Sequence, residues 1–406
     1  MAALLIRNIA HLAGVREQPE LLRGKQLAKL PGIDQAYLII DGETIAAYGT
    51  MKEFAFRDAD FNEVYDAAGR TVLPAWCDSH THTVFAASRE GEFVDKIKGL
   101  TYAEIAARGG GILHSARKLE TTSESELYRL ARGRVEELRK LGTGAIEIKS
   151  GYGLDLDNEL KMLRVIGRVQ QFFQSKARIV PTCLAAHIKP KDFEGSQEAY
   201  LAWITAELLP QIRTEQLSQR VDIFVEQSAF GLAESRQFLQ KAKALGFDLT
   251  VHADQFTAGS STLAVEMGAL SADHLEASTE KEIYALAQSD TVAVVLPGAS
   301  LGLGEPFAPA RKLLDAGACV AIASDFNPGS APMGDLLTQA AILATYQKLS
   351  TAEVLSGLTF RAAKALKLRE VGRIETGYSA DVQGYACADY REILYQQGRL
   401  KPYGVW

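Results

Sequence analysis

The sequence predicts an α/β fold: a (β/α)8 TIM-like barrel with a small composite β-sandwich domain built from both termini. Its 406 residues suffice for one barrel-sized unit and a smaller one, since an ordinary domain takes roughly 100–200 residues. The middle of the chain alternates apolar β-type runs with segments of helical period, whereas both ends hold short strands and turns. We expect residues 1–68 and 363–406 to form the sandwich and residues 69–362 to form the barrel.

The N-terminal segment is typical of short strands joined by turns. Apolar runs at 36–40 and 44–48 flank Asp41-Gly42, and Asp-Gly between two such runs is a strong hairpin signal. The C-terminal segment has the same character, with a run of small and apolar residues at 380–386. Neither end alone has enough strands for a stable core, so we expect the two ends to pair.

The middle of the chain contains eight apolar β-type runs, which is the strand count of a (β/α)8 barrel. In order, these runs are 71–78, 144–149, 178–187, 221–226, 248–252, 270–274, 291–296 and 319–324. The segments of helical period are 125–141, 158–173, 200–212, 233–245, 281–288, 309–316 and 333–349. Val- and Ile-rich runs separated by helices are typical of a buried parallel sheet. A doubly wound open sheet is the alternative, which eight strands make less favourable.

Composition and charge argue against several classes of protein. A chain that is 47% hydrophobic and 23% charged is not disordered as a whole. A net charge of −6 without a basic cluster argues against a nucleic-acid partner. No apolar run approaches the roughly 20 residues of a membrane span, and the N-terminus lacks the basic region of a signal peptide. Four scattered cysteines without a C-x-x-C pair favour a reducing, cytoplasmic compartment.

The ends of the predicted barrel strands hold five of the seven histidines of the chain. These five are His80, His82, His187, His252 and His274. The C-terminal strand ends of a (β/α)8 barrel share one rim, and the chemistry of such enzymes is located there. We therefore expect an active site on this rim.

His80 and His82 close the first barrel strand, two residues apart. Residues i and i+2 of a strand face the same side, so both imidazoles can reach one ion. His252 and Asp325, from the fifth and eighth strands, complete a set of three histidines and one carboxylate. These donors suit zinc and iron alike. A chance turn sequence would explain His-Thr-His by itself, but it does not explain all four residues.

These residues and several longer strings resemble the amidohydrolase superfamily, whose pattern is a strand ending in His-x-His, later strand-end histidines and an aspartate on the eighth strand. Within that superfamily, the chain resembles the imidazolonepropionase family. The matching strings are DSHTH at 78–82, GLTYAEI at 99–105, GGGI at 109–112, EIKSGYGL at 147–154, HADQ at 252–255, LSADHLE at 270–276, TVAVVLPGA at 291–299 and DFNPG at 325–329.

The resemblance implies metal-dependent hydrolysis of the cyclic amide of 4-imidazolone-5-propanoate to N-formimino-L-glutamate, a step of histidine degradation, by a homodimer. It implies that the metal is bound by His80, His82, His252 and Asp325. The residues that it implies for binding the small-molecule substrate are Arg89, Tyr152, His187, Gln255, Asn327, Gly329 and Ser330. Binuclear relatives use a modified lysine after the fourth strand, where this chain has Val225-Glu226-Gln227. We therefore expect one divalent metal per chain, zinc or iron.

The chemistry of ring opening suggests catalytic roles for three residues of the site. A divalent metal lowers the pKa of bound water toward about 7 and polarises the carbonyl group. Asp325 is expected to accept the proton of the water and to deliver it to the leaving ring nitrogen. His274 is expected to donate a hydrogen bond to the oxygen on which negative charge develops, and Gln255 is expected to contact the ring. Arg89 offers a bidentate fork for the substrate carboxylate.

Several of these residues also have a purely structural interpretation. Arg89 could pair with a neighbouring glutamate at the surface, Tyr152 could belong to a turn, and His187 could be a core histidine. Lys149 is interpreted as structural rather than catalytic. The glycines at 109–111 fit a loop that covers a ligand, or a phosphate-binding nest without the Lys-Ser/Thr of a P-loop. A nucleobase deaminase and a non-catalytic scaffold protein are the alternative functions.

Overall fold

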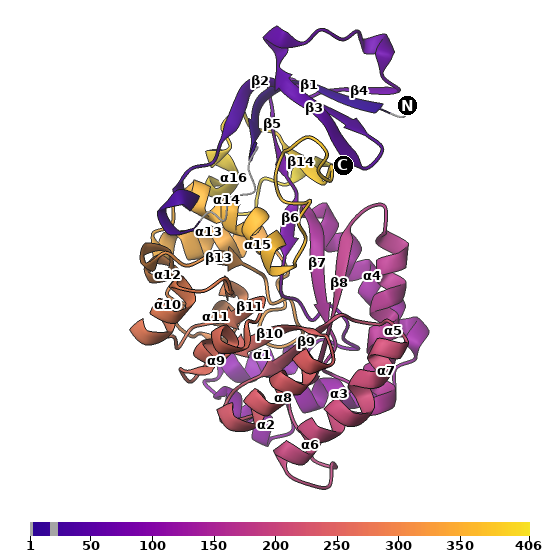
Figure 1. Cartoon of the computed structure of the whole chain (residues 1–406), viewed down its shortest axis with the longest axis vertical. Coiled ribbons are helices and arrows are strands. Elements are labelled where there is room, and N and C mark those ends of the chain that lie inside the picture. Colours follow the sequence, from indigo (N-terminus) through magenta and orange to yellow (C-terminus); the bar gives the residue numbers. More distant parts are fainter. Residues whose placement is uncertain (1–2, 17–22) are drawn as a thin grey trace.

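The computed structural model describes residues 3–16 and 23–406, which form two sheets with helices around them. An eight-stranded parallel sheet forms the barrel, and a seven-stranded mixed sheet lies at one end of it (Figure 1). Both ends of the chain contribute strands to the mixed sheet. The predicted fold class, a barrel with a small β domain built from both termini, is confirmed.

The barrel strands follow one another in sequence order, each parallel to the next. They are β6 (Trp76–Asp78), β7 (Thr143–Lys149), β8 (Arg178–Ala186), β9 (Arg220–Phe224), β10 (Asp248–Ala253), β11 (Ser271–His274), β12 (Val292–Val295) and β13 (Val320–Ile322). The barrel closes because the N–H of Asp325 donates to the carbonyl of His80 at 3.0 Å, and the N–H of His82 donates to that of Phe326 at 2.8 Å. Closure therefore brings the residues after the last strand beside those after the first.

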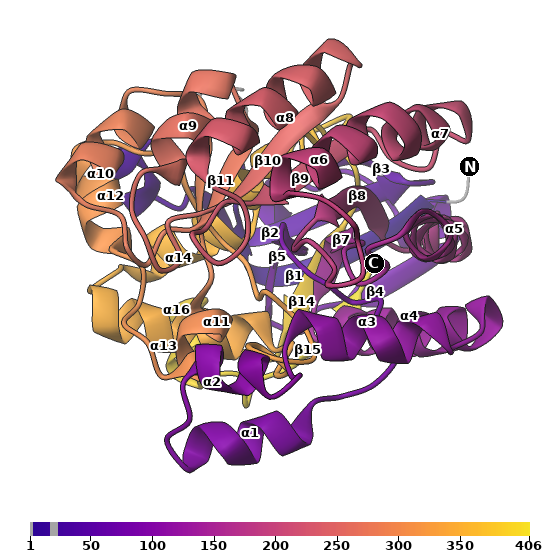
Figure 2. The same cartoon turned by 90° about the horizontal axis from the view of Figure 1, so that it is seen from below.

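Sixteen α-helices are assigned among the described residues. They are α1 (Glu90–Ile97), α2 (Tyr102–Ala107), α3 (Ile112–Glu120), α4 (Glu124–Lys140), α5 (Leu156–Phe173), α6 (Gln197–Trp203), α7 (Leu209–Thr214), α8 (Leu232–Ala244), α9 (Ser260–Met267), α10 (Glu280–Ala287), α11 (Pro297–Leu303), α12 (Ala310–Ala316), α13 (Leu336–Gln347), α14 (Thr351–Leu358), α15 (Phe360–Ala365) and α16 (Arg391–Tyr395). Figure 2 views the barrel from the end opposite the small sheet, where α1 and α2 lie at the periphery. None of the described helices is long and apolar enough to cross a membrane.

Helix α4 illustrates why these segments fold as they do. The hydroxyl of Ser123 caps its first turn by accepting a hydrogen bond from the N–H of Glu126 at 3.2 Å. Its buried residues Leu127, Ala131 and Val135 recur every four positions, which places them on one face of the helix. Burying a side chain such as Leu127 contributes roughly 1.5–3 kcal/mol, so this apolar face holds the helix against the barrel.

The mixed sheet joins the two ends of the chain. Its strands are β1 (Ala3–Ala13), β2 (Gly32–Asp41), β3 (Thr44–Thr50), β4 (Glu63–Asp66), β5 (Thr71–Pro74), β14 (Val382–Tyr385) and β15 (Pro402–Val405). The order is β15-β14-β5-β1-β2-β3, and β4 also pairs with β1. Strands β2 and β3 form the hairpin predicted at Asp41-Gly42, with a φ of 61° at Gly42.

One predicted strand is divided between the two sheets. The run 71–78 was expected to be a single barrel strand, but β5 pairs with β14 of the small sheet and only β6 belongs to the barrel. The N–H of Ala75 donates to the carbonyl of Asp381, and the N–H of Trp76 donates to that of Gly142, both at 2.9 Å. The hydrogen-bond partner therefore changes between two consecutive residues, and the strand connects the two domains without a linker.

Candidate active site

A small cavity of about 50 Å³ lies at the C-terminal ends of the barrel strands. The residues that line it are His82, Arg89, Ile112, Tyr152, His187, Phe224, His252, Gln255, His274, Leu303, Asp325, Asn327 and Ser330. Ten of the twelve site residues expected from the sequence are among them. His80 lies directly beside Asp325, and Gly329 packs against Arg89, so the structure brings all twelve together.

Four potential metal donors converge on one side of the cavity. The Nε2 atoms of His80 and His82 each lie 3.5 Å from Oδ1 of Asp325. The Nε2 atom of His252 lies 3.4 Å from that of His82. Ligands about 2.1 Å from a tetrahedral ion are about 3.4 Å apart. All four side chains are buried, and Nε2 of His80 has no hydrogen-bond partner among the described residues. The residues present therefore fit a metal ion.

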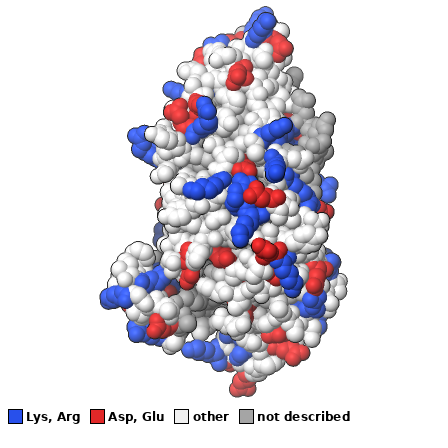
Figure 3. All heavy atoms as spheres, turned by 90° about the vertical axis from the view of Figure 1, so that its left-hand side faces the viewer, with Lys and Arg blue, Asp and Glu red and all other residues white. Residues whose placement is uncertain are grey.

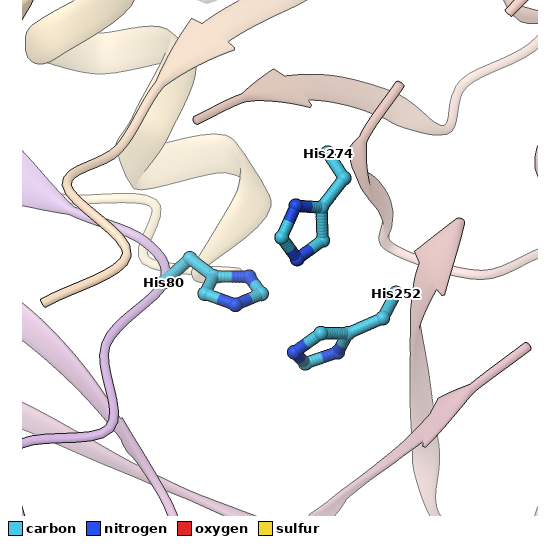
Figure 4. Close-up of side chains that lie close together, drawn as sticks. All are labelled: His80, His252 and His274. Carbon is cyan, nitrogen blue, oxygen red and sulfur yellow. The ribbon is translucent and has the colours of Figure 1, made fainter. Parts of the chain in front are cut away.

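His274 lies close to the same donors. His80, His252 and His274 form a second group whose ligand atoms lie within 4.8 Å of one another. Figure 4 shows their three rings turned toward a common centre. His80 also forms a group with Glu147 and Asp273. All three groups include His80, so the structure contains a candidate metal site that is centred on this residue.

Two buried carboxylates orient the histidines of this site. Oδ2 of Asp273 lies 2.7 Å from Nδ1 of His80, and Oδ2 of Asp222 lies 3.1 Å from Nδ1 of His252. These contacts leave Nε2 of each ring free to face the centre, as is usual for metal-binding histidines. Burial lowers the pKa of His252 to about 4, although Asp222 opposes the shift. The imidazole is thus neutral near pH 7, which is the form that binds a metal.

Lys149 contacts both of the carboxylates that orient the histidines. Its fully buried Nζ lies 2.7 Å from Oδ2 of Asp222, 2.6 Å from Oε2 of Glu147 and 3.8 Å from Oδ2 of Asp273. Burial alone would lower the pKa of Lys149, but the three carboxylates outweigh it and raise the pKa above its ordinary value. Lys149 does not line the cavity. The sequence analysis did not identify Asp222 as a residue of the site. An acidic residue within an otherwise apolar strand was the signal that could have identified it.

His274 and Asp325 face the cavity from strained backbone positions. Their φ angles are 87° and 53°, values that non-glycine residues rarely adopt and that concentrate at functional sites. Burial alone would lower the pKa of His274, but Glu276, whose Oε2 lies 3.6 Å from Nδ1, raises it above its ordinary value. Burial alone would raise the pKa of Asp325, but the hydrogen bond from His82 and the nearby histidines lower it. The cavity thus combines a carboxylate whose pKa lies below its ordinary value with a histidine whose pKa lies above its own.

Arg89 provides a cationic group at another wall of the cavity. Its side chain is buried, and Nε lies 3.4 Å from Oε2 of Glu92. Its Nη1 atom has no hydrogen-bond partner among the described residues. The guanidinium packs against Gly329, where a Cβ atom would overlap it. Arg89 therefore does pair with a neighbouring glutamate, but inside the site rather than at the surface.

Tyr152 and His187 lie on the loops that follow β7 and β8. Their ring centroids are 5.7 Å apart, and Nδ1 of His187 lies 2.9 Å from the carbonyl of Gly151. The carboxylate of Glu159 accepts hydrogen bonds from the N–H groups of Gly151 at 3.1 Å and Gly153 at 2.7 Å. Glu159 thereby holds the loop that carries Tyr152. Both rings line the cavity, so neither residue has a purely structural environment.

Asn327 shapes the loop after β13. Its Oδ1 accepts hydrogen bonds from the N–H groups of Gly329 at 2.7 Å and Ser330 at 2.8 Å. Its Nδ2 donates to the carbonyl of Asp325 at 2.6 Å. The hydroxyl of Ser330 donates to Oδ2 of Asp325 at 3.2 Å. This turn thus holds Asp325 and presents Ser330 to the cavity.

Solved structures share this architecture. The chain resembles 5-methylcytosine deaminase from Klebsiella pneumoniae with a TM-score of 0.73 at 15% identity, covering 97% of this chain and 96% of that one. It resembles an amidohydrolase from a Sargasso Sea sample with a TM-score of 0.69 at 20% identity, covering 100% and 91%. At these identities the likeness establishes the fold alone.

Sequence comparison is more specific. Residues 226–383 match the model of the amidohydrolase family. The imidazolonepropionase of Christiangramia forsetii is 42% identical over 93% of this chain and 92% of its own length. That of Deinococcus deserti is 39% identical over 100% and 98%. The chain therefore belongs to the imidazolonepropionase family of hydrolases, within the amidohydrolase superfamily.

Proposed function

We propose that the protein hydrolyses the cyclic amide of 4-imidazolone-5-propanoate and releases N-formimino-L-glutamate. The observation that carries the proposal is one cavity that is lined both by three of the four assigned metal donors and by a guanidinium without a hydrogen-bond partner at Nη1 among the described residues. Hydrolysis of the ring amide needs the metal, and binding of the propanoate carboxylate needs the guanidinium. The full-length relatives carry the name of this activity.

We assign one divalent metal, zinc or iron, to His80, His82, His252 and Asp325. Neutral imidazoles and a carboxylate suit both metals. When bound, such a metal lowers the pKa of water toward about 7 and polarises a carbonyl group. A second metal would need a bridging ligand such as a modified lysine. The residues directly after β9, Val225-Glu226-Gln227, include no lysine, and the three carboxylates around Lys149 already occupy its ammonium group.

The other steps of the reaction are assigned to side chains of the protein. Asp325 takes the proton of the attacking water and passes it to the ring nitrogen as the C–N bond breaks. His274 donates a hydrogen bond to the oxygen that gains negative charge. The other assigned contacts hold the substrate in place: Arg89, Tyr152 and His187 at the propanoate, Gln255 at the ring, and Asn327, Gly329 and Ser330 along the loop after β13.

We also propose that the enzyme is a cytoplasmic homodimer without a nucleic-acid partner. All four cysteines are free and buried, which suits a reducing compartment. Basic and acidic side chains are interspersed on the face drawn in Figure 3, and the net charge is −6. A nucleic-acid surface would instead gather basic side chains in one area.

Turnover of 4-imidazolone-5-propanoate by freshly purified protein, together with elemental analysis, tests the proposal. We expect turnover, one equivalent of tightly bound metal, and loss of both in His252→Ala. His11→Ala in the small sheet, where His11 pairs with Asp34, is the matched control. Deamination of guanine without turnover of the imidazolone would indicate a nucleobase deaminase. Two tight equivalents of metal, or full activity of His252→Ala, would contradict the metal assignment.

A further inference from the structure

The glycine-rich loop at 109–111 and the start of α3 separate the catalytic cavity from a second, larger one. Ile112 and Phe224 line both cavities, while Gly110 and Leu113 line the second but not the catalytic one; the volume of the second is about 430 Å³. The catalytic cavity, at about 50 Å³, is much smaller than this second cavity. Because Ile112 borders both cavities, a displacement of this loop would change the shape of the catalytic one.

Glu92 of α1 holds the loop in place. Its Oε1 accepts a hydrogen bond from the N–H of Gly111 at 3.0 Å. Gly109 and Gly111 have φ angles of 88° and 71°, in the left-handed region that favours glycine. A Cβ atom at Gly110 would lie 3.1 Å from Cδ of Glu92 and 2.7 Å from Cγ2 of Ile105. The loop is thus packed closely against the carboxylate of Glu92.

The other oxygen of the same carboxylate faces Arg89. Oε2 of Glu92 lies 3.4 Å from Nε of Arg89, and the Glu92 side chain is only 13% exposed. The contact is an ion pair at the Nε edge of the guanidinium, and neither Nε nor Nη1 has a hydrogen-bond partner among the described residues. Lys96, also on α1, donates to the carbonyl of Gly329 at 3.0 Å, behind the glycine against which Arg89 packs. Residues of one helix thus contact both the guanidinium and the glycine beside it.

We propose that Glu92 is a positioning residue that couples substrate binding at Arg89 to closure of the loop at 109–111. The proposal rests on the proposed function, in which Arg89 binds the substrate carboxylate. A guanidinium held in advance loses less freedom when a carboxylate binds. Because one carboxylate contacts both Arg89 and the loop, whatever favours the aligned guanidinium also favours the closed loop, and the reverse holds by linkage.

Glu92→Gln and Glu92→Ala separate the contact with the loop from the contact with Arg89; Oε1 of Glu92 also lies 3.5 Å from Nδ1 of His114. Glutamine keeps an oxygen that can accept from the N–H of Gly111 but removes the charge beside Arg89, whereas alanine removes both. We expect Glu92→Gln to raise the KM for 4-imidazolone-5-propanoate about tenfold, the effect of one charge-assisted contact, with a much smaller change in kcat. Glu92→Ala should raise KM further and speed hydrogen–deuterium exchange of the Gly111 amide. Glu90→Gln is the matched control, since Glu90 is exposed on the same helix and accepts a hydrogen bond from the hydroxyl of Ser88.

A substrate analogue without a carboxylate distinguishes positioning from a general structural role. Wild type and Glu92→Gln should turn over 5-ethyl-4-imidazolone with equal kcat/KM, because Arg89 has no carboxylate to bind there. An equal loss on both substrates, or a wild-type KM in both Glu92 variants, would overturn the proposal. If the wild type does not turn over the propanoate, the proposed function fails. Exchange at Gly111 in the ligand-free protein still tests the contact between Glu92 and the loop.

Discussion

Replacement of Lys149 by methionine tests whether the buried charges behind the candidate metal ligands stabilise the protein and the metal site. The ammonium group lies within 3.8 Å of the carboxylates of Glu147, Asp222 and Asp273, and all four side chains are fully buried. Removing one partner of a buried ion pair costs about 3–5 kcal/mol, because the other charge stays in the interior unpaired. We expect Lys149→Met to lower the free energy of unfolding of the metal-free protein by about this amount.

The same variant should weaken metal binding. Asp222 orients His252 and Asp273 orients His80, and loss of such outer contacts typically costs about 10–100-fold in metal affinity. Urea unfolding of the metal-free protein measures the first effect, and competition with a zinc chelator measures the second. Lys140→Met, at the exposed end of α4, controls for loss of a lysine. Wild-type stability and affinity in Lys149→Met would refute the reasoning.

Three further predictions concern other contacts. Gly329→Ala places a Cβ atom where the Arg89 guanidinium lies, so KM should rise about 10–100-fold; an unchanged KM would argue against carboxylate binding there. Burial raises the pKa of Glu353, but Arg311 and Ser350 outweigh it and lower the pKa. The wild type should therefore be more stable than Glu353→Gln at pH 7, and this difference in unfolding free energy should disappear as the pH falls below about 4.3. Urea titrations at several pH values measure the difference, and a difference that does not change with pH would refute the prediction. Ser123→Ala removes the N-cap of α4 and should cost about 1 kcal/mol in the same titration, whereas no loss would show that the cap is dispensable.

The barrel could be predicted from the sequence because its strands are locally encoded. A strand buried on both faces must be apolar along its whole length, so the runs at β7 to β13 stand out from the helices between them. The run at 71–78 was wrongly assigned to one sheet because an apolar stretch does not specify its hydrogen-bond partners. The exchange of partners between Ala75 and Trp76 depends on Asp381 and Gly142, which are distant in sequence.

The site was predictable to the extent that strand ends share a rim. That rule brings His82, His252 and Asp325 to one cavity, and the structure places them there. Sequence reasoning missed Glu276 beside His274 and Glu159 below the loop of Tyr152. Each lies only a few residues from the group it supports, yet neither an acidic residue after a strand nor one in the first turn of α5 has a local pattern that distinguishes a buried acceptor from an exposed one.

By itself, the sequence determined the number and order of the barrel strands and the rim on which the histidines gather, because hydrophobic periodicity and strand direction are local properties. Only the tertiary structure decided which charged side chains come into contact in the interior of the barrel. Lys149 on β7, Asp222 on β9 and Asp273 on β11 come from alternate strands, and inward side chains of alternate strands form one layer of a barrel. Their meeting depends on closure and register, which no local pattern of the chain encodes.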